Sequence, residues 1–317
     1  MAMEDLPVWY MALNSVKGMG RKTICKAINP LMDVSNTDEA YLFVQELAEQ
    51  YKRIKPPARD EFDTAVKRAR DILTQQEKDG IVPIVMGSNR YPNTLYALDD
   101  PPVVLYARGN VDALMQKGIA VVGTREVSPY GRTMGEHIGK FVAEHGFTVV
   151  SGLAEGCDTA GHRGCLQAGG VTIAIVATPL NQVYPKSNES LAKEILAHNG
   201  CFISEYPYGA QTSRYSFVER DRLQCGLANG VIVVETGEKG GTMHAVNGAL
   251  ALEKPVGCFN YKDDHYERHV SARGNRMLIN SGKAVALYSA ESMLAFLRSC
   301  DESAGAGGQG MYQSSLF

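Results

Sequence analysis

Residues 118–131 read GIAVVGTREVSPYG, which is a short apolar run, a glycine turn and a helix start in succession. The run Ile119–Val122 predicts a buried strand that ends at the turn Gly123-Thr124-Arg125. A helix is expected to follow, with Ser128 as its N-cap and Pro129 as its first residue. Amides left free at such a helix start, together with the helix dipole, suit this turn to an anion, and Arg125 adds a planar cation beside it.

Residues 147–170 repeat this arrangement. The run Phe147–Val150 predicts a second strand, and Ser151 and Gly152 begin a second glycine turn before another helix. Asp158 is the expected cap of that helix, and His162 is expected to be a hydrogen-bonded structural residue within it. Consecutive parallel strands place their carboxyl-end loops at one edge of the sheet, so the two turns should face one crevice.

Apolar runs continue to alternate with helical patterns beyond this point. Further strands are expected at residues 171–177, 201–204, 231–234, 256–259 and 284–287, before a last helix at 290–297. The loop after residue 234 contains Gly240, Gly241 and Thr242, and it predicts another phosphate cradle where a helix starts near Met243. This alternation predicts an α/β fold with a doubly wound, mostly parallel Rossmann-like sheet.

Three segments are expected along the chain. Residues 1–75 have the pattern of a small all-helical domain, residues 76–298 that of an extended Rossmann-like domain, and residues 299–317 that of a glycine-rich flexible tail. Two apolar runs, at 81–86 and 103–106, predict an antiparallel extension that leads into the main sheet.

Residues 15–28 read SVKGMGRKTICKAI and have the pattern of a helix-hairpin-helix. Such a turn presents backbone amides to a nucleic-acid phosphate, or it serves only to join two helices. Lys17, Arg21 and Lys22 beside the turn keep the first interpretation open.

Composition limits the classes of function. A chain of 317 residues with 44% hydrophobic content can bury a sizeable core, and its formal net charge of -3 neither indicates nor excludes a nucleic-acid partner. The seven cysteines are scattered singly, which argues against a zinc site and a disulfide framework and favours buried free thiols. No apolar run could span a membrane and no signal-peptide pattern is present, so a cytoplasmic location is expected. Neither a G-x-G-x-x-G turn after the first strand nor a Walker A motif occurs, so no NAD or ATP cofactor is expected.

Several separated motifs give the chain a resemblance to a known family. They are YPNTLYALDDPPVVLYARG (91–109), VVGTREVSPYG (121–131), VVSGLAEGCDTAGHRG (149–164), VYPKSN (183–188), ISEYP (203–207), FVERDRL (217–223), VIVVETGEKGGTMHA (231–245) and GNRMLINSG (274–282). With these motifs in this order, the chain resembles the DprA/Smf family of bacterial DNA-processing proteins, within the Rossmann-like folds related to the LOG phosphoribohydrolases.

The resemblance implies a homodimer that binds single-stranded DNA without strong sequence preference and helps to load the recombinase RecA in transformation or recombination. Carried over onto this sequence, the DNA pocket comprises Gly123, Thr124, Arg125, Ser151, Gly152, Lys186, Arg220, Arg222, Gly240, Gly241 and Thr242. One departure matters, because the family commonly has Arg-Asn-Arg where this chain has Arg220-Asp221-Arg222. A carboxylate is thereby expected in or near the anion site. Many relatives also end in a winged-helix domain for which this sequence leaves no room, and functions of that domain are not carried over.

The tail ends in Gln313-Ser314-Ser315-Leu316-Phe317. This pentapeptide resembles the motif by which bacterial proteins dock to the replication sliding clamp, with Gln313 at the rim and Leu316 and Phe317 in an apolar cleft. The sliding clamp is therefore an expected partner. The alternative is that the tail folds back onto the body of the protein.

Two alternative functions would use the same crevice. LOG-type relatives cleave the N-glycosidic bond of nucleoside monophosphates. Here no glutamate follows Gly240-Gly241-Thr242 at the required place, which argues against an enzyme. Carboxylates that could still act there are Glu155, Glu205, Glu219, Asp221 and Glu235. A sensor that binds a small nucleotide without turnover is the third alternative. No metal site is expected, because His265 and His269 lie in a very polar segment interpreted as a solvated loop.

Overall fold

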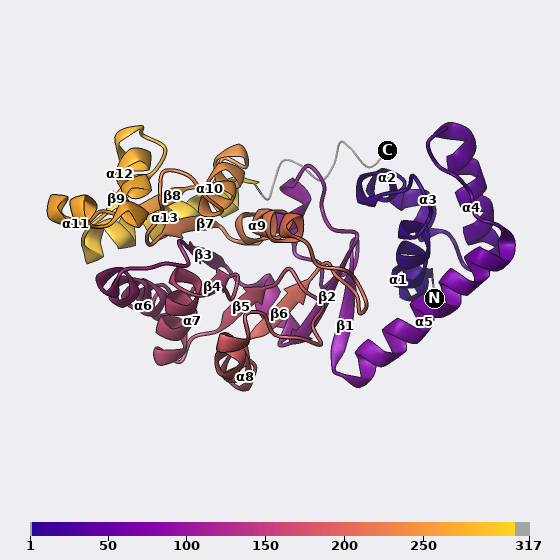
Figure 1. Cartoon of the computed structure of the whole chain (residues 1–317), viewed down its shortest axis with the longest axis horizontal. Helices are drawn as coiled ribbons and strands as arrows, with labels where there is room; N and C mark the ends of the chain where they lie inside the picture. The colour runs from indigo at the N-terminus through magenta and orange to yellow at the C-terminus, as the bar shows by residue number, and fades with distance from the viewer. Residues whose placement is uncertain (1, 308–317) are drawn as a thin grey trace.

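A helical domain and a larger α/β domain make up the protein in a computed structural model that describes residues 2–307 and the side chains of residues 5–302 (Figure 1). The helical domain comprises α1 (Ala2–Asn14), α2 (Arg21–Lys26), α3 (Ile28–Met32), α4 (Thr37–Gln50) and α5 (Arg59–Lys78). Its core is apolar and tightly closed, since Trp9, Leu13, Ile24 and Phe62 are fully buried. The long helix α5 then leads directly into the sheet.

The turn between α1 and α2 packs against its own domain. Gly18 has a positive φ of 86°, and a Cβ at this position would overlap the carbonyl oxygen of Arg53. The amide of Lys55 also donates to the carbonyl of Lys17, at 2.9 Å. Glycine is therefore required at residue 18 by the close approach of another segment of the chain.

The sheet within residues 2–307 has nine strands, in the order β1-β2-β6-β5-β4-β3-β7-β8-β9. They are β1 (Ile81–Val85), β2 (Val104–Gly109), β3 (Gly118–Val122), β4 (Thr148–Ser151), β5 (Thr172–Ile175), β6 (Cys201–Ser204), β7 (Gly230–Val233), β8 (Val256–Phe259) and β9 (Val285–Leu287). The strands β3 to β9 pair in parallel, whereas β1 pairs antiparallel with β2, and β2 with β6. The doubly wound, mostly parallel sheet and its antiparallel extension are thus confirmed.

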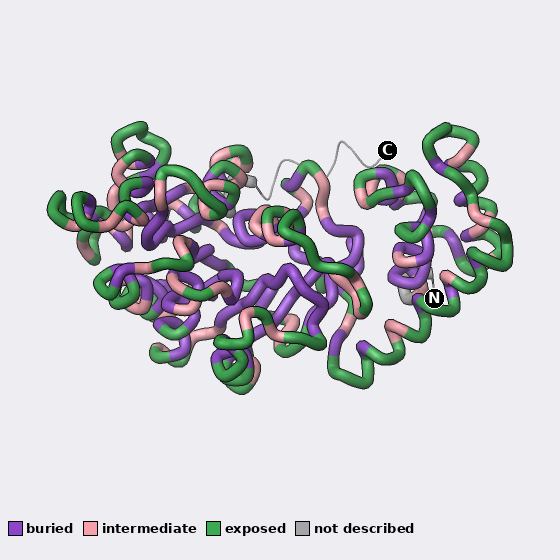
Figure 2. The backbone as a smooth tube through the Cα atoms, in the orientation of Figure 1, coloured by how far each residue is buried: buried purple, intermediate pink, exposed green. Residues whose placement is uncertain are grey.

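Helices cover both faces of the sheet. The remaining helices are α6 (Pro129–Glu144), α7 (Cys157–Gln167), α8 (Glu189–Ala197), α9 (Arg214–Leu227), α10 (Thr242–Ala251), α11 (Asp263–Arg268), α12 (Arg273–Asn280) and α13 (Ala290–Gly307), with short 3₁₀ turns η1 (Asn93–Ala97), η2 (Val111–Met115), η3 (Lys186–Asn188) and η4 (Val270–Ala272). Alternate residues of β3 serve opposite faces, because Ile119 and Val121 pack in a core with α6, α7 and α13, whereas Ala120 and Val122 pack in a core with α9 and α10. Figure 2 shows the buried strands between exposed outer helix surfaces.

The topology of the sheet determines where a ligand would bind. From β3 the chain proceeds to β4, β5 and β6 on one side, and β7, β8 and β9 lie on the other side. Strand order therefore reverses between β3 and β7, and open α/β sheets bind ligands in the crevice outside the carboxyl ends of the strands at such a point. The loops after β3 and β7 are the ones that contain Arg125 and Gly240.

Several local predictions can be checked directly. The start of α6 is confirmed, with Ser128 Oγ accepting a hydrogen bond of 2.9 Å from the amide of Gly131. All seven cysteines are free, and six of them are buried, as expected. The segment around His265 was predicted to be a loop, and that prediction is wrong, because Asp263–Arg268 forms the short helix α11. Among the described residues, no helix is long and apolar enough to cross a membrane.

Candidate functional site

Three loops meet at the carboxyl ends of β3, β4 and β7 and bind one another through backbone hydrogen bonds. The amide of Thr124 donates to the carbonyl of Glu235 at 2.7 Å, and the amide of Cys157 donates to the carbonyl of Thr124 at 3.1 Å. Gly123 is essential to this contact, because a Cβ there would lie 2.5 Å from Cys157 Sγ and 2.6 Å from the Glu235 carbonyl oxygen. The loops predicted to face one crevice do lie together at one edge of the sheet, but part of their backbone is already used to hold them to one another.

The start of α6 already holds an anion, which is the carboxylate of Glu235. This side chain is fully buried and accepts hydrogen bonds from the amide of Ser128 at 2.8 Å and from its hydroxyl at 2.6 Å. His265 Nε2 lies 2.8 Å from the same carboxylate, and its ring stacks on Tyr261 with centroids 4.1 Å apart. The anion site predicted at this helix start is therefore occupied from within the chain. His265 is correspondingly a partly buried partner of Glu235, whereas a solvated residue was expected.

The second glycine turn is also closed. Asp158 Oδ2 accepts hydrogen bonds from the amides of Gly152 at 3.1 Å and Ala154 at 3.3 Å, although Gly156, and not Asp158, is the N-cap of α7. Ser151 is fully buried, and its hydroxyl donates to the carbonyl of Val121 at 2.6 Å. Ser151 and Gly152 thus form the floor of the crevice and lie beneath the surface that a ligand could touch.

His162 has the structural role expected of it. It is fully buried in α7, with Nδ1 2.7 Å from the hydroxyl of Thr172 on β5. Burial lowers the pKa of this imidazole to about 3. The side chain is neutral near pH 7 and ties α7 to the sheet.

The start of α10, which was predicted to be a phosphate cradle, is open. Gly240 and Gly241 are exposed, and nothing lies within 4 Å of the position of a Cβ on either residue. Among the hydrogen bonds of the described residues, none uses the amides of Gly240, Gly241 or Thr242 as donors. Three free amides at the start of a helix of 10 residues can bind an anion. This predicted element is accessible, in contrast to the starts of α6 and α7.

A row of aromatic and cationic side chains borders the crevice. The Arg125 guanidinium carbon lies 5.6 Å from the ring centroid of Phe217 on α9, and the Phe217 ring lies 5.5 Å from that of Tyr184. Tyr184 is 51% exposed, and Lys186 follows it at the exposed start of η3. Three segments that are distant in the sequence thereby form one surface on which a base could stack and a phosphate could bind.

Phe217 and Tyr184 were not among the predicted site residues. Both lie within the quoted motifs FVERDRL and VYPKSN, next to the predicted cations Arg220 and Lys186. An aromatic residue beside a predicted phosphate-binding cation is the signal that could have identified them. The sequence alone does not show that the two rings meet.

Arg220 lies beneath this surface in a cluster of charges. Its side chain is 6% exposed, with Nη1 3.2 Å from the carbonyl of Ile175 and 3.8 Å from Asp158 Oδ2, and with Nε 3.3 Å from Asp221 Oδ1. A Cβ on Gly152 would occupy the place of this guanidinium. In the orientation that satisfies its neighbours, the amide oxygen of Gln224 accepts from Arg220 Nη1 and from the amide of Gly152, both at 2.8 Å. Arg220 therefore stabilises the floor of the crevice by its contacts with Ile175, Asp158 and Asp221.

Asp221 is the carboxylate expected near the anion site. The pKa of Asp221 is raised to about 6, mainly by burial and in part by the neighbouring Asp158, while the charges of Arg220, His244 and Arg125 oppose the shift. The same interactions place Asp221 between the loop after β3 and the start of α10. Burial likewise raises the pKa of Asp158.

Arg222 lies apart from the crevice, in an ion network between the two domains. Its Nη2 lies 2.6 Å from Glu205 Oε1, and its Nε lies 3.6 Å from Asp100 Oδ1. Arg21 at the start of α2 joins the network through Asp100 and Glu205 and binds Glu219 at 2.9 Å. The helical geometry of α9 explains this placement, because residues two positions apart, such as 220 and 222, point to opposite sides of a helix. The structure therefore brings all the predicted pocket residues except Arg222 to the crevice or its floor.

The carboxylates considered for catalysis all have partners in the folded chain. Glu155 accepts from the hydroxyl of Ser187 at 2.5 Å, Glu205 and Glu219 bind arginines, Asp221 binds Arg220, and Glu235 binds Ser128. In the part of the chain that the structure describes, three or more potential metal-ligating side chains do not meet at any point. The predicted clamp-binding residues Gln313, Leu316 and Phe317 lie outside the described residues.

Comparisons with known proteins find relatives over most of the chain. The family model of DNA recombination-mediator protein A matches residues 83–298, which is more than half of the chain. The DNA processing protein DprA of Bacillus subtilis is 34% identical over 224 residues, which cover 70% of this chain and 73% of that protein. The protein Smf of Escherichia coli is 36% identical over 186 residues, which cover 56% of this chain and 50% of that protein.

Two solved structures are similar over much of the chain. The X-ray structure of DNA processing protein A from Streptococcus pneumoniae has a TM-score of 0.73 and 25% identity, and the match covers 92% of this chain and 97% of that one. The DNA processing protein A of Helicobacter pylori, whose structure concerns its single-stranded DNA binding mode, has a TM-score of 0.61 and 26% identity, with coverages of 69% and 96%. The match to the first structure thus includes both the helical and the α/β part of this chain.

Proposed function

Because the chain belongs to the family of DNA recombination-mediator protein A, we propose that its crevice binds single-stranded DNA without strong sequence preference. The Helicobacter pylori relative binds single-stranded DNA, which supports this choice of ligand. In this chain the ligand's phosphates would bind at Arg125, Lys186 and the free amides of Gly240, Gly241 and Thr242, and its bases would stack on Phe217 and Tyr184.

The observation that carries this proposal is the contact of Arg125 with Phe217 beside an open helix start. Free amides and a guanidinium bind phosphate of any sequence, and an aromatic face accepts any base. A mononucleotide site would need groups that read one base or enclose one sugar. The crevice instead presents an open row of stacking and phosphate-binding groups, which suits a strand.

The direct test is fluorescence anisotropy of a labelled oligothymidine with the native protein at about 50 mM and about 200 mM salt. We expect saturable binding that weakens steeply with salt, because each neutralised phosphate of a single strand contributes about 0.7 to the slope of log K against log salt. A double-stranded oligonucleotide and nucleoside monophosphates serve as competitors. Saturable binding of a monophosphate with no binding of the strand would favour the sensor, and release of free base from the monophosphate would favour the phosphoribohydrolase.

Asp221 should make the binding of DNA dependent on pH. Its pKa of about 6 means that it is charged at pH 8 and largely neutral near pH 5. A charged Asp221 repels phosphate beside Arg125, so the affinity of the native protein should rise as the pH falls through about 6. The variant Asp221→Asn should bind oligothymidine on the order of tenfold more tightly at pH 8 and keep nearly that affinity at lower pH.

His244 faces the same carboxylate and is the control for this effect. Asp158, Arg220 and Arg125 also act on Asp221 electrostatically. The variant His244→Gln should retain the rise in affinity at low pH if Asp221 causes it. If the affinity of Asp221→Asn for DNA changed with pH as that of the native protein does, Asp221 would not be the cause of the pH dependence.

The proposal includes a cellular role and protein partners. We propose promotion of RecA loading during transformation or recombination in the cytoplasm, with the protein as a homodimer and the sliding clamp as a further partner of the tail. For the homodimer, support comes from four exposed apolar side chains at the β9 end of the molecule. Val270 is 65% exposed, Val285 54%, Tyr288 69% and Met277 37%.

A further inference from the structure

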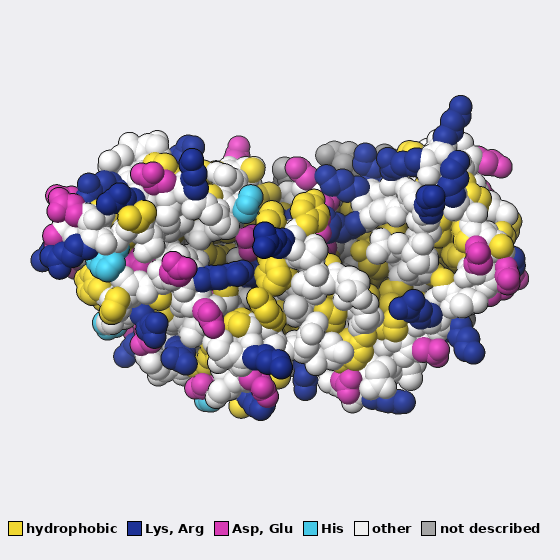
Figure 3. Space-filling model, viewed as in Figure 1, with side chains coloured by type: hydrophobic (Ala, Val, Ile, Leu, Met, Phe, Trp, Pro, Cys, Tyr) yellow, Lys and Arg dark blue, Asp and Glu magenta, His cyan; other side chains and the backbone are white. Residues whose placement is uncertain are grey.

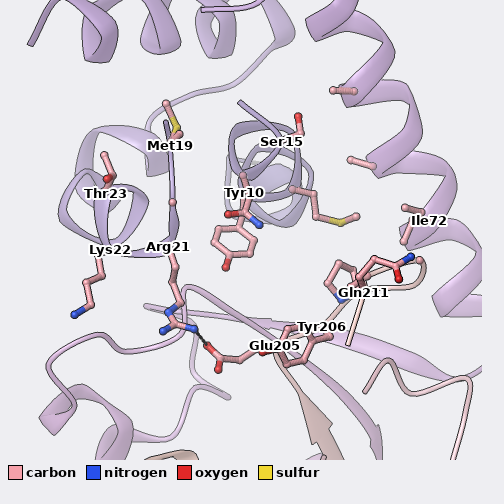
Figure 4. Close-up of a pocket in the computed structure, with 18 of the residues that line it drawn as sticks. Tyr10, Ser15, Met19, Arg21, Lys22, Thr23, Ile72, Glu205, Tyr206 and Gln211 are labelled. Atoms are coloured by element: carbon pink, nitrogen blue, oxygen red, sulfur yellow. Dashed lines mark ion pairs between the residues drawn. The ribbon is translucent and has the colours of Figure 1, made fainter. Parts of the chain in front are cut away.

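A groove separates the helical domain from the α/β domain. Its walls are α1, α2 and α5 on one side and the segment 205–211 with the first half of α9 on the other, and it encloses about 1250 Å³. Figure 4 shows Arg21 reaching across it from α2 to Glu205, with the rings of Tyr10 and Tyr206 beside this ion pair. Small-molecule sites usually enclose about 300–1000 Å³, so this open groove suits an extended ligand better than a small one.

The carboxylates in the lining of the groove already have partners. Asp100 and Glu205 bind Arg21 and Arg222, and Glu219 binds Arg21 and the hydroxyl of Tyr206. Glu61 accepts a hydrogen bond of 3.1 Å from the amide of Ala58 at the start of α5. Three of these four carboxylates are therefore paired with arginines, and Glu61 remains exposed on α5.

Three cations in the lining remain available. Lys22, Arg53 and Arg68 are exposed, and none of them forms an ion pair with a described residue. The guanidinium of Arg53 is oriented by a hydrogen bond of 2.6 Å to the hydroxyl of Thr23. Arg68 reaches the opposite wall, where a Cβ on Gly209 would lie 3.8 Å from its Nη2. The groove thus presents positive charge to any occupant along the helical domain.

Tyrosines supply the groove with aromatic surface. Tyr206, Tyr208 and Tyr215 line the α/β wall and Tyr10 the helical wall, and Tyr215 is 67% exposed. Figure 3 shows hydrophobic side chains in the depth of this hollow and Lys and Arg side chains around it. Tyr215 is exposed, Tyr206 and Tyr208 are partly buried and Tyr10 is buried. Cations without an ion-pair partner beside aromatic rings are the composition of surfaces that bind single strands.

Helix α9 contributes residues to both the groove and the crevice. Tyr215 and Val218 of this helix face the groove, while Phe217 and Arg220 face the crevice, so neighbouring residues of one helix border both. We infer that the groove is a second contact surface for the same DNA strand, which leaves the crevice at Phe217 and crosses the start of α9 into the space between the domains. This inference rests on the proposed function of the crevice.

The test compares oligothymidines of about 6 and about 20 nucleotides, because only the longer strand can occupy both surfaces. The triple variant Lys22→Gln, Arg53→Gln, Arg68→Gln removes the three cations and keeps most of each stem. We expect it to bind the short strand like the native protein and the long strand more weakly. For the long strand, the slope of log K against log salt should become shallower by about 2, since three phosphate contacts are lost at about 0.7 each.

The control variant Lys140→Gln, Lys193→Gln, Lys283→Gln removes the same charge from exposed positions outside both surfaces. Its affinity for both oligothymidines and both slopes of log K against log salt should equal those of the native protein. An unchanged long-strand slope in the groove variant would overturn the inference while leaving the crevice function intact. A native protein that binds neither strand would overturn the crevice function, and the groove inference with it.

Discussion

The variant Arg125→Ala is expected to lose single-stranded DNA binding by at least about tenfold, and Arg125→Ala with Phe217→Ala by roughly a hundredfold or more. The exposed guanidinium lies 5.6 Å from the Phe217 ring centroid, so removing it takes away a phosphate contact and one side of the stacking surface together. A hydrogen bond to a charged group contributes about 1.5–3 kcal/mol, and stacking of a base about 1–3 kcal/mol. Anisotropy with labelled oligothymidine measures both losses.

The control for this prediction is Arg163→Ala. Arg163 is an exposed arginine of α7 with no ion-pair partner among the described residues, and its removal changes the net charge by the same amount. We expect its affinity for DNA to stay within about twofold of the native value, because charges beyond a Debye length are largely screened. Arg125→Lys should be intermediate, since an ammonium keeps the charge but not the planar stacking face. Equal losses in Arg125→Ala and Arg163→Ala would indicate a diffuse charge effect and contradict a built site.

Much of the fold followed from local patterns in the sequence. The apolar run before Gly123, the cap Ser128 and the proline at residue 129 define a strand, a turn and a helix through neighbouring residues alone, and the structure has all three. Alternation along the chain was enough to predict a parallel sheet. The short helix α11 was missed because its residues are almost all polar, and Tyr266, which is 3% exposed, and His265, which binds Glu235, anchor it to the body.

The site was harder to predict, because its state depends on contacts between distant segments. A glycine turn before a helix has the same sequence pattern whether its amides are free or already bound. At α6 the Ser128 amide is bound by Glu235, which is more than 100 residues away, and the Gly131 amide by the Ser128 hydroxyl. At α10 no described residue accepts from the amides of Gly240, Gly241 or Thr242. Likewise the sequence does not distinguish the roles of Arg220 and Arg222, but Arg220 supports the crevice and Arg222 joins the domains.

Arg220→Met is expected to destabilise the folded protein by about 3–5 kcal/mol. Methionine has a similar length and leaves no large cavity, so the loss comes from the charges that remain. Asp158 and Asp221 have side chains 8% and 15% exposed, and both face the guanidinium of Arg220. Without this cation the two carboxylates repel each other in a poorly solvated place. Urea unfolding measured by circular dichroism gives the change in the free energy of unfolding.

The loss should depend on pH in a defined direction. Burial already holds the pKa of Asp221 at about 6, above its ordinary value of 3.8, and removal of Arg220 should raise it further. A carboxyl whose pKa is raised on folding binds its proton more tightly in the folded state, so stability falls as the pH rises from the unfolded pKa to the folded one. The native protein and Arg220→Met should therefore differ less near pH 5, where Asp221 is largely neutral in both, and most near pH 8.

A second substitution separates charge from packing. Asp221→Asn in the Arg220→Met background removes one of the two buried charges while keeping nearly the same shape, and it should restore at least about 1 kcal/mol of stability at pH 8. Gly152→Ala approaches the same cluster from the other side, because its Cβ would displace the guanidinium without removing it. If Arg220→Met were equally destabilised at pH 5 and pH 8 and gained nothing from Asp221→Asn, packing over Gly152 would be the main role of Arg220. A recovery confined to high pH would show that Arg220 holds two carboxylates in the floor of a site built for an anion.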